Sequence, residues 1–249
     1  MSNRYKILTE TTVITLLVVS VKFLLHVLGW EFFAITPLHT GIFAGTIFVL
    51  GFIASSTHTD YKESEKIPAE ITASLESLSQ DGELFKQRYP EFRLAEYQAI
   101  ITEVLVLFKE DVEHHTSKSL RKVKELYAFF YDLESLGVPA NYIVKLKQDL
   151  LSVVKCLLRM RYLLKIQPLP SAFLLVEFIV FAIVGMLLFT DIPGLRNEML
   201  VTGFFAFLYT YLLKLIAVME LPFHPQGTTK DDVSIFLLSE LAERIKEKK

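Results

Sequence analysis

Four long apolar runs dominate the pattern of hydrophobic and polar residues along the chain. They extend over residues 11–30, 37–55, 172–190 and 199–218. Each run has close to the roughly 20 residues that an α-helix needs to cross about 30 Å of hydrocarbon. The pattern therefore predicts four transmembrane helices.

Short links join these runs in two pairs. Residues 31–36 connect the first run to the second, and residues 191–198 connect the third to the fourth. Both links leave room only for a tight turn, and Pro37 and Pro193-Gly194 suit such turns. We therefore expect two antiparallel hairpins, an N-terminal transmembrane hairpin at 1–56 and a C-terminal one at 169–219.

Basic residues near the ends of the runs predict the orientation of the helices. Arg4 and Lys6 precede the first run, and Arg161 and Lys165 precede the third, whereas the two short links contain only Arg196. Cytosolic loops of membrane proteins carry an excess of Lys and Arg. The chain is therefore predicted to be a multi-pass protein of the cell membrane, with its termini and its central region in the cytosol.

The central region, residues 57–168, is predicted to form a cytosolic helical domain. Apolar residues recur there at helical spacing, and Asp81-Gly82 is expected to break the first of its helices. A cytosolic tail follows at 220–249, with a short amphipathic helix. Its apolar stripe includes Phe236 and Leu241, and either the chain's own bundle or a neighbouring subunit can cover it. The fold class is thus an all-α membrane protein, with two hairpins and a cytosolic helical bundle.

Composition excludes several classes of function. The chain has 26 Lys and Arg against 28 Asp and Glu, so its charge gives no reason to expect nucleic acid as a partner. Cys156 is the only cysteine, so no disulfide forms within the chain. Neither a nucleophile-base pair nor paired catalytic carboxylates nor a Gly-rich phosphate loop is evident. We expect no enzymatic activity, no cofactor and no metal site.

One face of the second run changes character along its length. It begins with small residues, continues with two phenylalanines and ends with hydroxyl side chains. Rings of phenylalanine around an axis would form a hydrophobic constriction that gates an ion path by dewetting. The alternative is that the small residues and the phenylalanines pack against another helix. The candidate pore-lining positions are Gly41, Ala44, Gly45, Phe48, Phe52, Ser55, Ser56 and Thr59.

Ionisable residues within the runs are candidates for a function because they are costly in a membrane. Glu177 and Lys214 lie at similar depth in the third and fourth runs, so they are expected to pair, unless Lys214 extends to the interface. Lys22 and His26 share a face of the first run. They either attract anions toward a pore or pair with polar groups of a neighbouring helix.

Two short motifs resemble the bestrophin channel family. Phe48-Val49-Leu50-Gly51-Phe52 is similar to the core of that family's second membrane helix. Leu213-Lys214 and then Glu220-Leu221-Pro222-Phe223 resemble the family's Leu-Lys run and the turn that follows it. The order of spans and cytosolic helices is also similar. The resemblance implies a homopentamer with an axial pore lined by the second helix, which mostly passes chloride and other small anions. Its partners would be identical copies, membrane lipids and small inorganic ions.

The sequence departs from the family pattern at several places. Ala44 stands where the family usually places a bulky aliphatic residue, and a polar stretch follows the neck motif. Asp231-Asp232 comes too late to match the family's calcium-binding acids. Calcium gating is therefore not carried over. The leading hypothesis is a homo-oligomeric anion channel, and the alternative is a non-conducting membrane scaffold that presents its cytosolic helices to a partner.

Overall fold

The computed structural model describes residues 5–165, 170–223 and 233–247. The chain forms two compact units. The first unit contains the described residues up to 61 together with residues 170–221, and the second unit contains the rest. Among the described residues, four helices are long and apolar enough to cross a membrane, and they agree with the four predicted spans.

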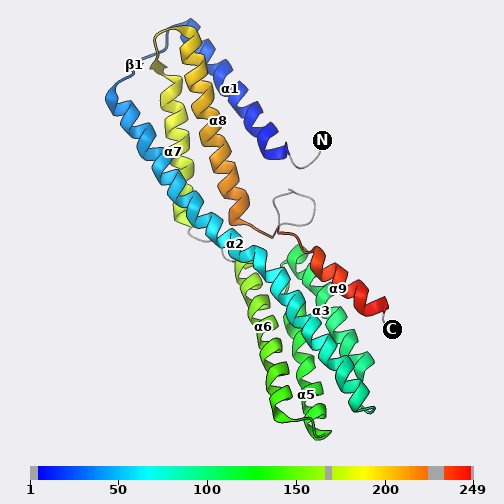
Figure 1. Ribbon diagram of the computed structural model, residues 1–249. Helices are drawn as coiled ribbons and strands as arrows, with labels where there is room; N and C mark the ends of the chain where they lie inside the picture. Colours follow the sequence, from blue (N-terminus) through cyan, green and yellow to red (C-terminus); the bar gives the residue numbers. More distant parts are fainter. Residues whose placement is uncertain (1–4, 166–169, 224–232, 248–249) are drawn as a thin grey trace. The chain divides into compact units, whose positions relative to one another are not determined.

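The first unit contains α1 (Lys6–Leu28), the beginning of α2 (Pro37–Arg88), α7 (Pro170–Leu188) and α8 (Leu195–Glu220). α1 packs most extensively against α8, and α8 also packs against α7 (Figure 1). The packing thus departs from the predicted N-terminal hairpin, because the main partner of α1 is not α2.

A short sheet explains this departure. In the link after α1, β1 (Phe33–Ala34) pairs in parallel with β2 (Thr190–Asp191), which follows α7. The backbone N–H groups of Phe32 and Phe33 also donate to the carbonyl oxygen of Phe189, at 3.0 and 3.1 Å. The first link is thereby attached to the second link and does not close a tight turn. A two-residue strand is too short to leave a periodic signal in the sequence.

α2 contributes one face to the core of the first unit. Phe43 and Leu50 are buried there against α7 and α8, together with residues such as Val176 and Ile183. The Tyr209 hydroxyl of α8 donates to the backbone carbonyl of Phe43 at 3.1 Å, which gives this buried tyrosine a partner. Because Phe43 and Leu50 point into the core, the opposite face of α2 points away from it.

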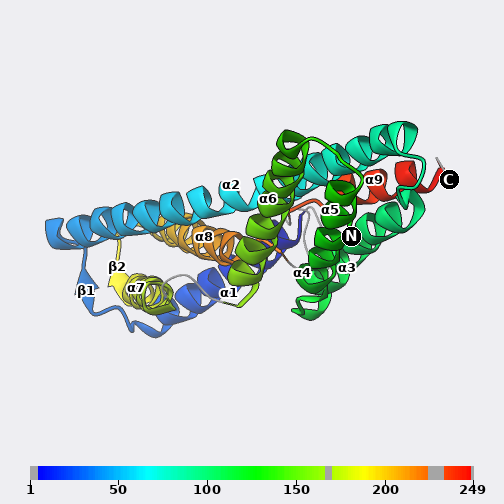
Figure 2. The same cartoon turned by 90° about the horizontal axis from the view of Figure 1, so that it is seen from below.

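The second unit consists of helices, in agreement with the predicted helical character of the central region and tail. α5 packs against α6, and α9 lies beside α3 (Figure 2). Besides residues 62–88 of α2, its elements are α3 (Leu94–His114), α4 (Lys118–Lys122), the 3₁₀ turn η2 (Val123–Glu125), α5 (Leu126–Ser135), α6 (Ala140–Lys165) and α9 (Phe236–Glu247).

The predicted break at Asp81-Gly82 is wrong, because α2 continues through both residues to Arg88. A Cβ atom at position 82 would lie 2.9 Å from Cε1 of Tyr97, on α3. Glycine is therefore present here because α2 and the Tyr97 ring approach closely, and not because the helix ends.

The amphipathic helix of the tail is covered by the chain's own bundle. Leu241 and Ile245 are buried, α9 packs on α3, and Arg244 pairs with Glu76 of α2 at 2.7 Å. Phe236, at the start of α9, is 56% exposed. Of the two alternatives that the sequence left open, packing within the subunit is the one observed.

Candidate functional site

The candidate pore-lining face of α2 is uncovered in the subunit. All eight predicted positions, from Gly41 to Thr59, are exposed, and the rings of Phe48 and Phe52 are 76% and 71% exposed. A Cβ atom added at Gly41 or Gly45 would meet no neighbouring atom within 4 Å. This face therefore does not pack against another helix among the described residues of the same chain.

The chemistry of this face differs from that of another exposed face in the same unit. α7 exposes mostly bulky apolar side chains over two turns, among them Leu174, Phe178 and Phe181, with Glu177 as the exception. On α2 the exposed positions change from small through aromatic to polar, and the Thr59 hydroxyl donates to the Ser55 carbonyl at 3.0 Å. Bulky apolar faces suit lipid, whereas a face of glycine and hydroxyl residues gains little from lipid contact.

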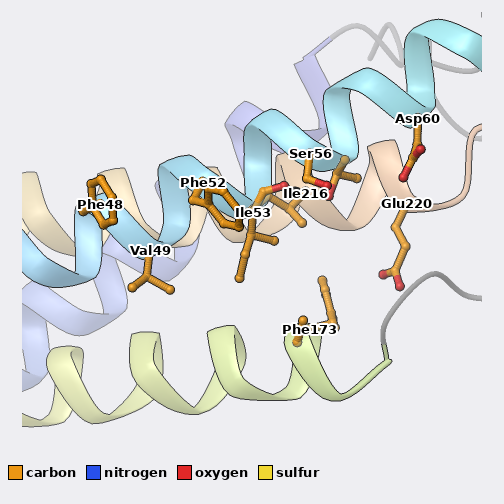
Figure 3. Close-up of a pocket in the computed structure, with 11 residues that line it drawn as sticks. Phe48, Val49, Phe52, Ile53, Ser56, Asp60, Phe173, Ile216 and Glu220 are labelled. Atoms are coloured by element: carbon orange, nitrogen blue, oxygen red, sulfur yellow. Dashed lines mark hydrogen bonds between the residues drawn. The ribbon is translucent and has the colours of Figure 1, made fainter.

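A cavity lies beside the two phenylalanines. It has a volume of about 290 Å³ and lies between α2, α7 and α8 (Figure 3). Phe48, Phe52 and Phe173 are among its apolar lining residues, and Asp60 and Glu220 lie toward one end. The exposed phenylalanine face of α2 therefore borders a cavity within the first unit.

Lys22 and His26 belong to a compact ionic cluster at the C-terminal end of α1. Lys22 is fully buried, and its Nζ lies 2.6 Å from Oε1 of Glu31 and 2.5 Å from Oε1 of Glu198. Nδ1 of His26 lies 3.0 Å from Oε2 of each carboxylate. The two basic residues therefore pair with polar groups of neighbouring segments, which was the second alternative that the sequence left open.

Backbone carbonyls complete the environment of Lys22. Its ammonium donates to the carbonyl oxygens of Thr190 at 2.6 Å and Leu188 at 3.2 Å, in addition to Glu31. Burial raises the pKa of the Glu31 carboxyl, but its close contacts with Glu198, Lys22 and His26 outweigh this effect and lower that pKa to about 2. Glu31 is therefore ionised at neutral pH.

Sequence reasoning missed both acids of this cluster. Glu31 follows the first apolar run directly, and Glu198 precedes the fourth. In an up-and-down arrangement of spans, both positions lie at the same membrane surface as the end of the first helix. That topological signal places both acids at the same membrane surface as His26, but it does not specify which of them reaches the histidine.

The predicted pair of Glu177 and Lys214 is wrong, because Lys214 forms an ion pair with Glu10 of α1. α1 packs against α8, so Glu10 is the acid that the lysine reaches. Glu177 is exposed on α7, and no ion pair with it is present among the described residues.

The second motif that resembles bestrophins lies at the end of α8. Phe223 is buried, and the Pro222 carbonyl accepts a hydrogen bond from the Val233 N–H at 2.9 Å. The turn after α8 is thereby joined to the chain that leads into α9. Asp231-Asp232 lies outside the described residues.

Comparisons with known structures identify the fold. Crystal structures of two variants of a bacterial bestrophin homologue from Klebsiella pneumoniae align with TM-scores of 0.81 and 0.74, each at 13% identity. The first alignment covers 97% of this chain and 97% of the other, and the second covers 99% and 98%. No family model matches the sequence, and no curated protein sequence matches it. The resemblance that the motifs indicated is thus confirmed at the level of the fold, over nearly the whole chain.

Proposed function

We propose that this chain is the subunit of a homo-oligomeric ion channel in the cell membrane, and that the exposed face of α2 lines its narrow neck. The bestrophin fold over nearly the whole chain supports the channel as a class. The observation that carries the neck assignment is the exposure of all eight positions on a face that is small, aromatic and polar in turn.

The order of side chains along this face suits ion passage. Gly41 and Gly45 leave a wide path at one end, and Phe48 and Phe52 narrow it in the middle. Apolar rings around a narrow path exclude water unless the path widens, which is how hydrophobic gates close. The positive edges of aromatic rings tolerate a passing anion. At the other end, hydroxyl groups such as that of Ser56 replace part of the hydration shell.

The described part of one subunit leaves the neck face of α2 open, so the proposal requires several copies around an axis. Five is the number that the resemblance implies, with chloride or another small anion as the conducted ion. The termini and the second unit then lie in the cytosol. In this arrangement the neck face of each α2 contacts the axis, while the exposed leucine and phenylalanine side chains of α7 contact lipid.

Phenylalanine substitution tests the neck assignment directly. Purified protein in a planar lipid bilayer is expected to conduct, and Phe48→Ala and Phe52→Ala are expected to change the single-channel conductance or the open probability. Phe178→Ala and Phe181→Ala are matched controls, because these phenylalanines are 70% and 80% exposed on α7. The controls should conduct like the wild type. An equal response of all four variants, or none in the α2 variants, would refute the neck assignment.

Two further measurements test the ion and the assembly. Under a chloride gradient, the reversal potential of the current should approach the equilibrium potential of chloride. The mass of the solubilised particle should be a multiple of the 28.5 kDa subunit. A monomeric particle without any current would contradict the channel function and favour the alternative, a non-conducting membrane scaffold.

A further inference from the structure

Glu198 is a buried carboxylate that lies at ion-pair distance from Lys22 and His26 but accepts no hydrogen bond among the described residues. Its side chain is fully buried, and neither of its oxygens accepts a hydrogen bond from the described residues. Lys22 lies 2.5 Å away, but an ammonium has three N–H groups, and these donate to Glu31 and to the carbonyls of Leu188 and Thr190. A buried polar group in this condition calls for a further ligand, such as an ion.

The geometry around the second oxygen of each carboxylate suits a metal ion. Nδ1 of His26 lies 3.0 Å from Oε2 of Glu31 and 3.0 Å from Oε2 of Glu198, and the ligand atoms all lie within 4.8 Å of one another. Zinc binds imidazole nitrogen and carboxylate oxygen at about 2.0–2.2 Å, so its tetrahedral ligands are separated by roughly 3.3–3.6 Å. The two Nδ1–Oε2 distances are close to that spacing.

The charges around these three ligand atoms also favour a cation. With a neutral imidazole, the two carboxylates and the single ammonium leave a net charge of −1 in a largely buried place. Lys22 pairs with the Oε1 atoms of the two carboxylates, whereas His26 lies beside their Oε2 atoms, so the ammonium orients both carboxylates and leaves the Oε2 atoms for a metal. The His26 side chain is 37% exposed, which leaves an approach for an ion and a position for a water ligand.

We propose that His26, Glu31 and Glu198 bind a divalent transition-metal ion of the zinc type. Imidazole suits zinc and its neighbours in the first transition row, whereas magnesium and calcium prefer oxygen ligands alone. The site goes beyond the proposed channel function and does not depend on it. A bound metal joins the end of α1, the link before α2 and the start of α8, and it therefore stabilises these three segments together.

Trp30 provides a built-in reporter for this site. It is the only tryptophan of the chain and directly precedes Glu31, so a paramagnetic Co²⁺ ion at the site should quench its fluorescence. Tag-free, full-length protein in detergent is titrated with Co²⁺ after treatment with a chelator. Zinc content is then measured by mass spectrometry after equilibration and gel filtration, in the presence of excess Mg²⁺.

Three variants decide the outcome. His26→Gln and Glu198→Gln are expected to weaken metal binding by at least about tenfold, since each removes a ligand. His39→Gln is the control, because His39 belongs to the same unit and, among the described residues, forms hydrogen bonds only with Thr36. We expect one zinc per chain in the wild type and in the control. If Glu198→Gln does not fold, His26→Gln decides alone, since its side chain is partly exposed.

Two results would overturn the proposal. One is the absence of stoichiometric zinc and of saturable quenching in the wild type, as expected if Glu198 is protonated and shares its proton with Glu31. The other is an unchanged affinity in His26→Gln. As a separate readout, zinc should raise the melting temperature of the wild type and leave that of His26→Gln unchanged.

Discussion

Replacing Lys22 by methionine should destabilise the protein strongly. Methionine matches the length of the lysine stem but carries no charge, so Lys22→Met leaves the fully buried Glu198 without its cation at 2.5 Å. It also removes the donor to Glu31 and to two backbone carbonyls. Removing one partner of a buried ion pair typically costs about 3–5 kcal/mol of unfolding free energy.

This loss corresponds to a measurable change in melting temperature. For chains of 150–250 residues, a loss of 1 kcal/mol lowers the melting temperature by roughly 2–4 °C, so Lys22→Met should melt roughly 6–20 °C below the wild type. The protein is heated in detergent with a chelator, in aliquots at increasing temperatures. Gel filtration of each aliquot measures the folded fraction, and the midpoint of its loss is the melting temperature. The chelator ensures that no bound metal contributes.

Two further variants isolate the cause. Lys22→Met combined with Glu198→Gln removes the uncompensated buried charge and should regain a large part of the lost stability. Lys214→Met removes another lysine from an ion pair, but Lys214 and Glu10 are 28% and 44% exposed, so its cost should be about 1 kcal/mol or less. The reasoning fails if Lys22→Met has the same melting temperature as the wild type, or if the double variant is no more stable than Lys22→Met.

The second unit supports three more predictions. Burial, together with the contact to Glu70, raises the pKa of the Cys156 thiol to about 12, so its alkylation rate should still increase tenfold per pH unit at pH 10; a plateau near pH 9 would contradict this. Gly82→Ala brings a methyl group against the Tyr97 ring and should cost about 1–3 kcal/mol in chemical unfolding, whereas an unchanged midpoint would exclude the close packing. Asp111 accepts hydrogen bonds from two hydroxyls and two backbone N–H groups, so Asp111→Ala should lower the free energy of unfolding by roughly 3 kcal/mol. A smaller loss than that of Gly82→Ala would argue against this network.

The spans and the shared face of Phe48 and Phe52 could be predicted because their signals are local. A run of apolar residues is sufficient to identify a membrane helix, and the spacing of Phe48 and Phe52 places them on one face without knowledge of any neighbour. The exposure of that face in the subunit agrees with a role outside the subunit's own core, although its place at a pore is still a proposal.

The packing of α1 could not be predicted in this way, because it depends on distant segments. The β1–β2 pairing joins residues that are 157 positions apart, Phe33 and Thr190, and no periodic pattern marks it. The same packing determines the ion pairs: Lys214 reaches Glu10 because α1 lies against α8, and Lys22 reaches Glu198 for the same reason. Charge partners in a membrane unit follow from helix adjacency, which a single sequence does not specify.

The most direct test of the central claim is the modification of a cysteine at position 52 from the aqueous phase. In a Cys156→Ser background, Phe52→Cys and Phe178→Cys are each treated with a charged methanethiosulfonate reagent while ion flux into proteoliposomes is recorded. The channel account predicts that modification changes flux through Phe52→Cys and leaves flux through Phe178→Cys unchanged. Complete modification of Phe52→Cys with unaltered flux would contradict it.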